Sequence, residues 1–160
     1  MGRIGEFSLK DQIFLRAYRW RHIDPVPWTV LDKPLSECRL ALVSTAGLVL
    51  PDQEPFDKSV KGGDYSMRLI PGDTRVSDLI DTHRSRSYDH TGLHSDANLA
   101  FPLDRARELV AQGRVGSLAN EHVSLMGSIT APGRFVRDIA PQAATRLRDD
   151  GVDIALLVPV

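Results

Sequence analysis

The chain has 160 residues, of which 42% are hydrophobic and 26% are charged, a composition typical of a soluble globular protein. Its net charge of −1 provides no overall positive field to attract nucleic acid or acidic membranes, so neither is expected as a partner. No apolar run approaches the roughly 20 residues of a membrane-spanning helix, and the first residues lack the apolar core and small-residue cleavage site of a secretory signal. The single cysteine excludes an internal disulfide and favours a cytoplasmic location.

A helix is predicted near the start of the chain, over about residues 9–21. Ser8 is a suitable N-cap, and apolar residues follow it at helical spacing. Two prolines within residues 24–28 then favour an extended connector. We therefore predict an N-terminal helix and connector over residues 1–28, followed by an α/β domain over residues 29–160.

The most strand-like segment of the first half covers residues 39–50. Its nearly continuous apolar residues are typical of a strand that is buried on both faces. Ser44, Thr45 and Gly47 interrupt the segment where a strand would pass into a loop. Residues 51–63 are rich in Gly, Pro and Asp and are predicted to form a loop.

Three more helices are predicted in the second half of the chain, over about residues 73–83, 102–113 and 141–151. Capping residues or proline mark their starts, and glycine ends the last two. A short apolar strand is predicted at residues 153–158. This pattern predicts an α/β fold, a layered sheet with flanking helices, with the strand order left open. Because a buried strand ends the sequence, the domain is expected to be incomplete at its C-terminus.

The densest polar cluster of the sequence is residues 88–98. His90, His94 and Asp96 provide two imidazoles four residues apart and a carboxylate. Such residues share a face as metal ligands only on a helix, whereas Gly92 and the Asp, Asn and Ser content favour a loop. Three interpretations stay open: a metal site, a hydrogen-bonded loop scaffold, and a substrate or acid–base role, for which histidine suits neutral pH.

Other polar or reactive residues give weaker signals. His83 is predicted to be a core histidine, and Cys38 a structural thiol beside an acidic neighbour. Residues 44–47 follow a strand and offer backbone amides to an anion, although the sequence of a P-loop is absent. Gly127 either lets the backbone approach a ligand or forms a turn.

Residues 90–105 closely resemble a signature of the B subunits of glycine, sarcosine, betaine and D-proline reductases, the selenoprotein B family. Residues 114–118 and 124–128 resemble the next blocks of that family, in the same order. Residues 150–160 resemble the strand that precedes the redox-active loop of the family. The resemblance covers most of the chain from about residue 39.

This resemblance implies an α/β subunit of a reductase complex that cleaves the C–N bond of an amino acid or an N-methylated derivative. In the family, a cysteine or selenocysteine after the last strand attacks the substrate carbon, and a pyruvoyl group on a partner subunit holds the amine. The nucleophile would follow Val160, so no cofactor is expected in this chain. The implied partners are a small amine or amino-acid substrate and other reductase subunits. An exposed terminal strand also predicts a homo-oligomer.

The resemblance also assigns roles to individual residues. Either His90 or His94 is expected to assist proton transfer to the leaving amine, with Asp96 orienting a histidine. Asn98 is expected to bind a substrate carboxylate or to fix the loop, and substrate binding is also assigned to Ser44, Thr45, Met126 and Gly127. No metal is implied.

Two rival hypotheses remain. One is a non-catalytic ligand-binding or assembly module of the same ancestry. The other is a metal-dependent enzyme that uses His90, His94 and Asp96. Whether the chain is itself an enzyme depends on the nucleophile that the parent protein supplies.

Overall fold

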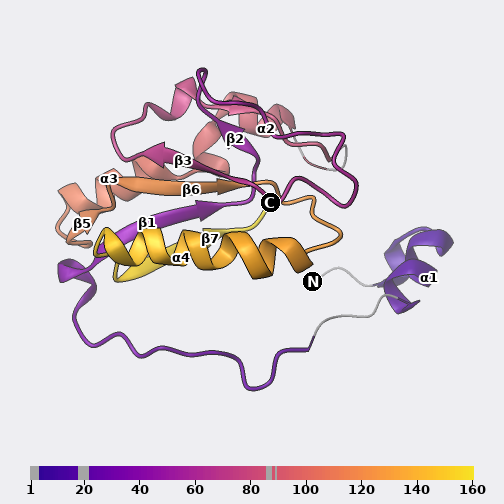
Figure 1. Cartoon of the computed structure of the whole chain (residues 1–160), viewed down its shortest axis with the longest axis horizontal. Helices are drawn as coiled ribbons and strands as arrows, with labels where there is room; N and C mark the ends of the chain where they lie inside the picture. The colour runs from indigo at the N-terminus through magenta and orange to yellow at the C-terminus, as the bar shows by residue number, and fades with distance from the viewer. Residues whose placement is uncertain (1–3, 18–21, 86–87, 89) are drawn as a thin grey trace. The chain divides into compact units, whose positions relative to one another are not determined.

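A computed structural model describes residues 4–17, 22–85, 88 and 90–160 of the chain. The chain forms two compact units, Met1–Val30 and Leu31–Val160, and each is described here by itself (Figure 1). The domain boundary expected after residue 28 stays a prediction.

The N-terminal unit contains a short 3₁₀ turn, Ile4–Glu6, and helix α1, Leu9–Ala17. Ser8 begins the helix as expected: its hydroxyl donates to Asp11 Oδ2 at 2.6 Å and accepts from the Asp11 amide at 3.3 Å. The last predicted helical residues, 18–21, lie outside the described residues.

The second unit is built on a mixed sheet around strand β1, Arg39–Ser44. Strand β7, Ile154–Val158, pairs with β1 in parallel. Strands β5, Ser117–Leu118, and β6, Glu121–Leu125, pair in parallel with the start and the end of β1. Strands β5 and β6 lie on one side of β1, and β7 lies on the other. Leu40, Val43 and Ser44 of β1 each pair with β7 and also with β5 or β6. Strand β3, Met67–Pro71, runs antiparallel to β6.

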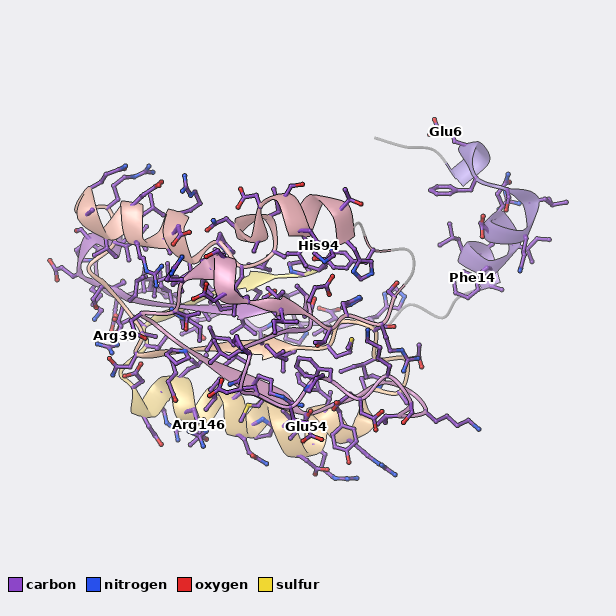
Figure 2. The ribbon with its side chains drawn as sticks, turned by 90° about the horizontal axis from the view of Figure 1, so that it is seen from above. Glu6, Phe14, Arg39, Glu54, His94 and Arg146 are labelled. Carbon is purple, nitrogen blue, oxygen red and sulfur yellow. The ribbon has the colours of Figure 1, made fainter. Side chains whose placement is uncertain are left out.

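Helices cover both faces of this sheet (Figures 1 and 2). Helices α2, His90–Ser95, and α3, Leu103–Ala111, lie on one face, and α4, Ala140–Asp149, lies on the other. A π-helical turn, Phe135–Ile139, leads into α4. The predicted α/β fold with flanking helices is confirmed, and α3 and α4 form where their terminal Pro and Gly residues predicted them.

The main core lies between the sheet and α3. It is formed by apolar residues of β1, β3, α2 and α3 and of the segment before α3, including Leu42, Ile70, Leu93, Phe101 and Leu103. Phe101 and Leu42 are fully buried. This core therefore fixes the start of α3, and with it the residues just before that helix.

The helix predicted over residues 73–83 does not form. The segment contains a 3₁₀ turn, Val76–Asp78, and strand β4, Ile80–Asp81, which pairs with strand β2, Leu48–Val49. Thr82 extends this contact, because its amide and its hydroxyl both donate to the Gly47 carbonyl. Pairing with a distant strand overrides the local helical pattern.

The loop expected for the polar cluster is also wrong in part, since residues 90–95 form helix α2. The polar residues that follow α2 begin the next turn. Asp96 is the N-cap of the 3₁₀ turn Ala97–Leu99, and its side chain accepts from the Asn98 amide at 2.9 Å. The loop predicted for residues 51–63 is confirmed.

Strand β7 was expected to be buried, and this expectation is wrong. Leu156 and Leu157 are 46% and 67% exposed. The strand pairs with β1 along one edge only, within the residues that the structure describes. It therefore presents apolar side chains and free backbone groups to the surroundings.

Candidate functional site

Strands β1, β6 and β7 end at the same edge of the sheet, where open α/β sheets commonly bind ligands. Thr45 joins all three: its amide donates to Val158 O at 3.1 Å, and its carbonyl accepts from the Gly127 amide at 2.8 Å. The Val160 amide donates to Thr45 Oγ1 at 2.9 Å. Two of the predicted binding residues, Thr45 and Gly127, thus lie together at the strand ends.

The close approach at this edge requires a glycine at position 127. A Cβ atom there would lie 2.8 Å from Thr45 O and 2.9 Å from Val160 O. Because both neighbours are backbone atoms, a side chain would force the three strand ends apart.

Gly127→Ala is therefore expected to lower the free energy of unfolding by about 1–3 kcal/mol. Chemical denaturation monitored by circular dichroism measures this change. Gly133→Ala is the matched control, because a Cβ at Gly133 would meet nothing within 4 Å. Equal stability of the two variants would contradict the close packing of the strand ends.

Two other predicted binding residues are parts of the core. Ser44 is fully buried, and its hydroxyl donates to Ala100 O at 2.7 Å. Met126 is 1% exposed and packs with Val49 and Phe56. Both side chains contribute to the scaffold beneath the strand ends.

A cavity of about 680 Å³ opens beside α2, within the size range of small-molecule sites. Leu48, Leu79 and Leu93 give it an apolar lining. Its polar lining includes Arg75, Asp81, His94, Asp96, Asn98 and Arg107. Three residues predicted from the polar cluster, His94, Asp96 and Asn98, therefore face one cavity.

Asp96 and Asn98 brace the wall of this cavity. Asn98 Nδ2 donates to Asp96 Oδ1 and to Asp104 Oδ2, each at 3.1 Å, and Asn98 Oδ1 accepts from the Asp104 amide at 3.1 Å. Arg107 continues the network by donating to Asp104 at 2.7 Å and to the Gly72 and Thr74 carbonyls. The expected contact of Asp96 with a histidine is not among the interactions of the described residues.

The carboxylate that contacts the histidines is Asp81, at the end of β4. Its side chain is 6% exposed. Asp81 Oδ2 is hydrogen-bonded to His90 Nδ1 and lies 3.4 Å from His94 Nε2. Asp81 Oδ1 accepts from the His83 amide at 2.9 Å. The four-residue spacing places both imidazoles on one face of α2, against this carboxylate.

Asp81 changes the proton affinity of its neighbours. Its hydrogen bond to His90, supported by the Ser85 carbonyl, raises the pKa of His90. Burial lowers the pKa of His83, which packs edge-on against Tyr88 with ring centroids 4.9 Å apart. Asp81 was missed in the sequence because its partners follow it by nine and thirteen residues.

The histidine cluster and the strand ends are connected through one short loop. Gly47 has a φ of +67°, and a Cβ there would lie 3.0 Å from His83 Cα. Its carbonyl accepts two hydrogen bonds from Thr82, the residue after Asp81. Thr45, two residues earlier, holds Val160. The cluster and the end of β7 therefore lie at the same edge of the sheet.

The residues do not favour the metal hypothesis. Across the described ranges, no three His, Cys, Asp or Glu side chains form a group that could hold a metal ion. His90 and His94 turn toward Asp81, whereas Asp96 is hydrogen-bonded to Asn98. Asp89, part of the same polar cluster, lies outside the described residues.

Two further reactive side chains lie in the core. Cys38 is fully buried, and its thiol faces the Pro34 carbonyl at 3.3 Å, as a structural cysteine would. His122 is also fully buried, and its Nδ1 accepts from the Leu42 amide at 3.1 Å. Burial lowers the pKa of His122 to about 4, so the ring is neutral at physiological pH.

Among the helices that the structure describes, none has the length and apolar character needed to cross a membrane.

Known proteins of one family resemble this chain. Residues 7–159 match the family described as Glycine/sarcosine/betaine reductase selenoprotein B (GRDB). D-proline reductase subunit gamma of Acetoanaerobium sticklandii is 35% identical over 136 residues, which cover 84% of this chain and 54% of that protein. Sarcosine reductase complex component B subunit beta of Peptoclostridium acidaminophilum is 30% identical over 150 residues, which cover 94% of this chain and 34% of that protein.

Glycine reductase complex component B subunit gamma of Carboxydothermus hydrogenoformans is 30% identical over 153 residues, or 94% of this chain and 34% of that protein. The chain thus spans between about a third and about half of the length of these relatives. No solved structure matches it. Because the match extends over nearly the whole sequence, the chain belongs to the glycine/sarcosine/betaine reductase selenoprotein B family.

Proposed function

We propose that this chain forms the substrate-handling part of the B component of an amino-acid or amine reductase. The observation that carries the proposal is the arrangement at one sheet edge. There, the cavity beside α2 adjoins the cluster of Asp81, His90 and His94, and the loop from Thr45 to Gly47 connects this cluster to the end of β7. The relatives are named as reductase subunits, which supports the same function.

In this proposal the cavity binds a small amine or amino acid and reductive cleavage breaks its C–N bond. A cysteine or selenocysteine after β7 supplies the nucleophile, and a pyruvoyl group on a partner subunit binds the amine, as the family resemblance implies. The backbone of Val160 is held by Thr45, so this edge suits a nucleophile presented after β7. The residues of this chain orient the substrate, limit its contact with water and hold a proton near its nitrogen.

The proposal also covers the partners, the oligomeric state and the location of the protein. We expect other reductase subunits as partners, because several relatives are named as components of reductase complexes. We also expect a homo-oligomer, because Leu156 and Leu157 of β7 are exposed, and a cytoplasmic location.

Thiol-dependent substrate consumption by the full-length protein with its reductase partners tests the proposal. Glycine, sarcosine, betaine and D-proline are supplied separately with a dithiol reductant, and substrate loss is followed by mass spectrometry. We expect one of the four to be consumed only when this protein is present. Binding of one of them without consumption would favour the non-catalytic binding module instead, and consumption in its absence would contradict the proposal.

A further inference from the structure

We propose that the two histidines of α2 have different roles: His94 is the proton donor to the bound amine, whereas His90 and Asp81 position it. This inference rests on the proposed function of the site and decides between two residues that the sequence treats alike.

Both ring nitrogens of His90 are occupied. Nδ1 is hydrogen-bonded to Asp81 Oδ2, and Nε2 lies 2.9 Å from the Ser85 carbonyl. A carbonyl and an ionised carboxylate only accept hydrogen bonds, so each nitrogen of His90 carries a proton and donates it. The ring is therefore a fixed cation with no N–H left for a ligand.

His94 is placed differently. It lines the cavity, and its side chain is 66% exposed, compared with 35% for His90. Its Nε2 lies 3.4 Å from Asp81 Oδ2, longer than a normal hydrogen bond but within reach of electrostatic attraction. Asp81 therefore does not hold His94 Nε2 in a normal hydrogen bond, which leaves this nitrogen open to a ligand in the cavity.

The position of Asp81 is fixed, so its Oδ2 atom can contact both His90 and His94. The strand pairing of Asp81 with Leu48 holds its backbone, and the His83 amide holds its Oδ1. Oδ2 is left between the two imidazoles. Among the described residues, the charged or titratable groups that influence or contact His90 are Asp81, His83, His94, Tyr88 and Lys58.

The chemical step uses one proton. As the C–N bond breaks, its electron pair moves to the nitrogen, which takes the Nε2 proton of His94. The carbon is transferred to the thiolate or selenolate nucleophile. His94 then regains a proton from water, while His90 keeps both of its ring protons and its hydrogen bonds throughout.

Chemical modification of the 160-residue chain tests the difference between the rings directly. Diethyl pyrocarbonate acylates accessible imidazole nitrogens that carry no proton, and peptide mass spectrometry gives the rate at each histidine. We expect His94 to react about tenfold faster than His90, because both nitrogens of His90 are protonated and hydrogen-bonded. His22, exposed in the N-terminal unit, is the internal reference.

The Asp81→Asn variant supplies the second arm of this test. Asp81→Asn removes the negative charge that keeps the His90 ring doubly protonated, so the reaction rate of His90 should rise toward that of His22. Equal rates at His90 and His94 in the unmutated chain, or a rate at His90 that Asp81→Asn leaves unchanged, would overturn the assignment.

Kinetics of the full-length protein in its reductase complex separate this inference from the proposed function. We expect His94→Gln to lower kcat about 100-fold with KM little changed, while His22→Gln keeps the original rate. We expect His90→Gln to lower kcat less and to shift the pH profile. A His94→Gln complex as fast as the original would overturn the inference alone. A complex that consumes no substrate in any form would overturn the proposed function, and the modification rates would then decide the roles of the rings.

Discussion

Phe101→Ala is expected to lower the free energy of unfolding by about 3–5 kcal/mol, the typical cost of removing a buried aromatic side chain. Phe101 is fully buried at the start of α3 and packs in the main core. Its ring also meets the His122 ring edge-on, with centroids 6.0 Å apart. The truncation would therefore leave a cavity beneath the segment that carries Asp96 and Asn98.

Urea unfolding followed by circular dichroism measures this loss as a lower midpoint with an unchanged slope. Phe101→Leu restores most of the volume and should cost less than about 1.5 kcal/mol. Phe7→Ala, at a phenylalanine that is 52% exposed, should change stability by less than about 0.5 kcal/mol. If Phe101→Ala were as mild as Phe7→Ala, the core would not be centred where the structure places it.

The second large effect is a loss of stability in mild acid, caused by His122. Burial, aided by the charge of Arg107, lowers the pKa of His122 from 6.5 to about 4. As the pH falls below 6.5, His122 becomes protonated in the unfolded chain but stays neutral in the folded chain until the pH approaches 4. The free energy of unfolding therefore decreases between pH 6.5 and pH 4, by about 3 kcal/mol from this residue.

The His122→Asn variant isolates this contribution. The Asn side chain can still accept from the Leu42 amide but does not titrate. We expect it to be less stable than the original chain at pH 7, because it fills less of the core, and to lose less stability from pH 6.5 to pH 4. Parallel pH profiles for the two proteins would show that His122 is not the acid-sensitive group.

His90 acts in the opposite direction. Its pKa is raised by Asp81, so its ion pair stabilises the folded chain fully below pH 6.5 and loses this effect as the pH rises through the raised pKa. The two histidines together place the highest stability of the unit near neutral pH.

The parts of the fold that could be predicted are those set by local sequence. Proline before α3 and glycine after α3 and α4 mark helix ends, because these residues restrict or release the backbone wherever they occur. Strand β1 is a run of apolar residues that is buried from both sides. These signals need no knowledge of the rest of the chain.

The parts that could not be predicted depend on contacts between distant residues. Strand β4 forms because β2 pairs with it, although its own residues match a helical pattern. The same pairing brings Asp81 to the histidines of α2, so the carboxylate of the site depends on a tertiary contact. Asp96, the carboxylate closest in sequence, is used by the backbone of the next turn. The sequence therefore indicated the two histidines and the residues of the cavity wall. It did not indicate Asp81, the carboxylate that contacts both histidines.

The measurement that tests the central claim most directly is a ligand titration of the isotope-labelled chain by nuclear magnetic resonance. Glycine, sarcosine, betaine and D-proline are added in turn, and the backbone and histidine signals are followed. We predict that one of these ligands shifts the signals of His94, Leu79 and Asn98 around the cavity, and leaves those of α4 unchanged. Shifts confined to α4, or no shift with any of the four, would contradict a substrate site beside Asp81.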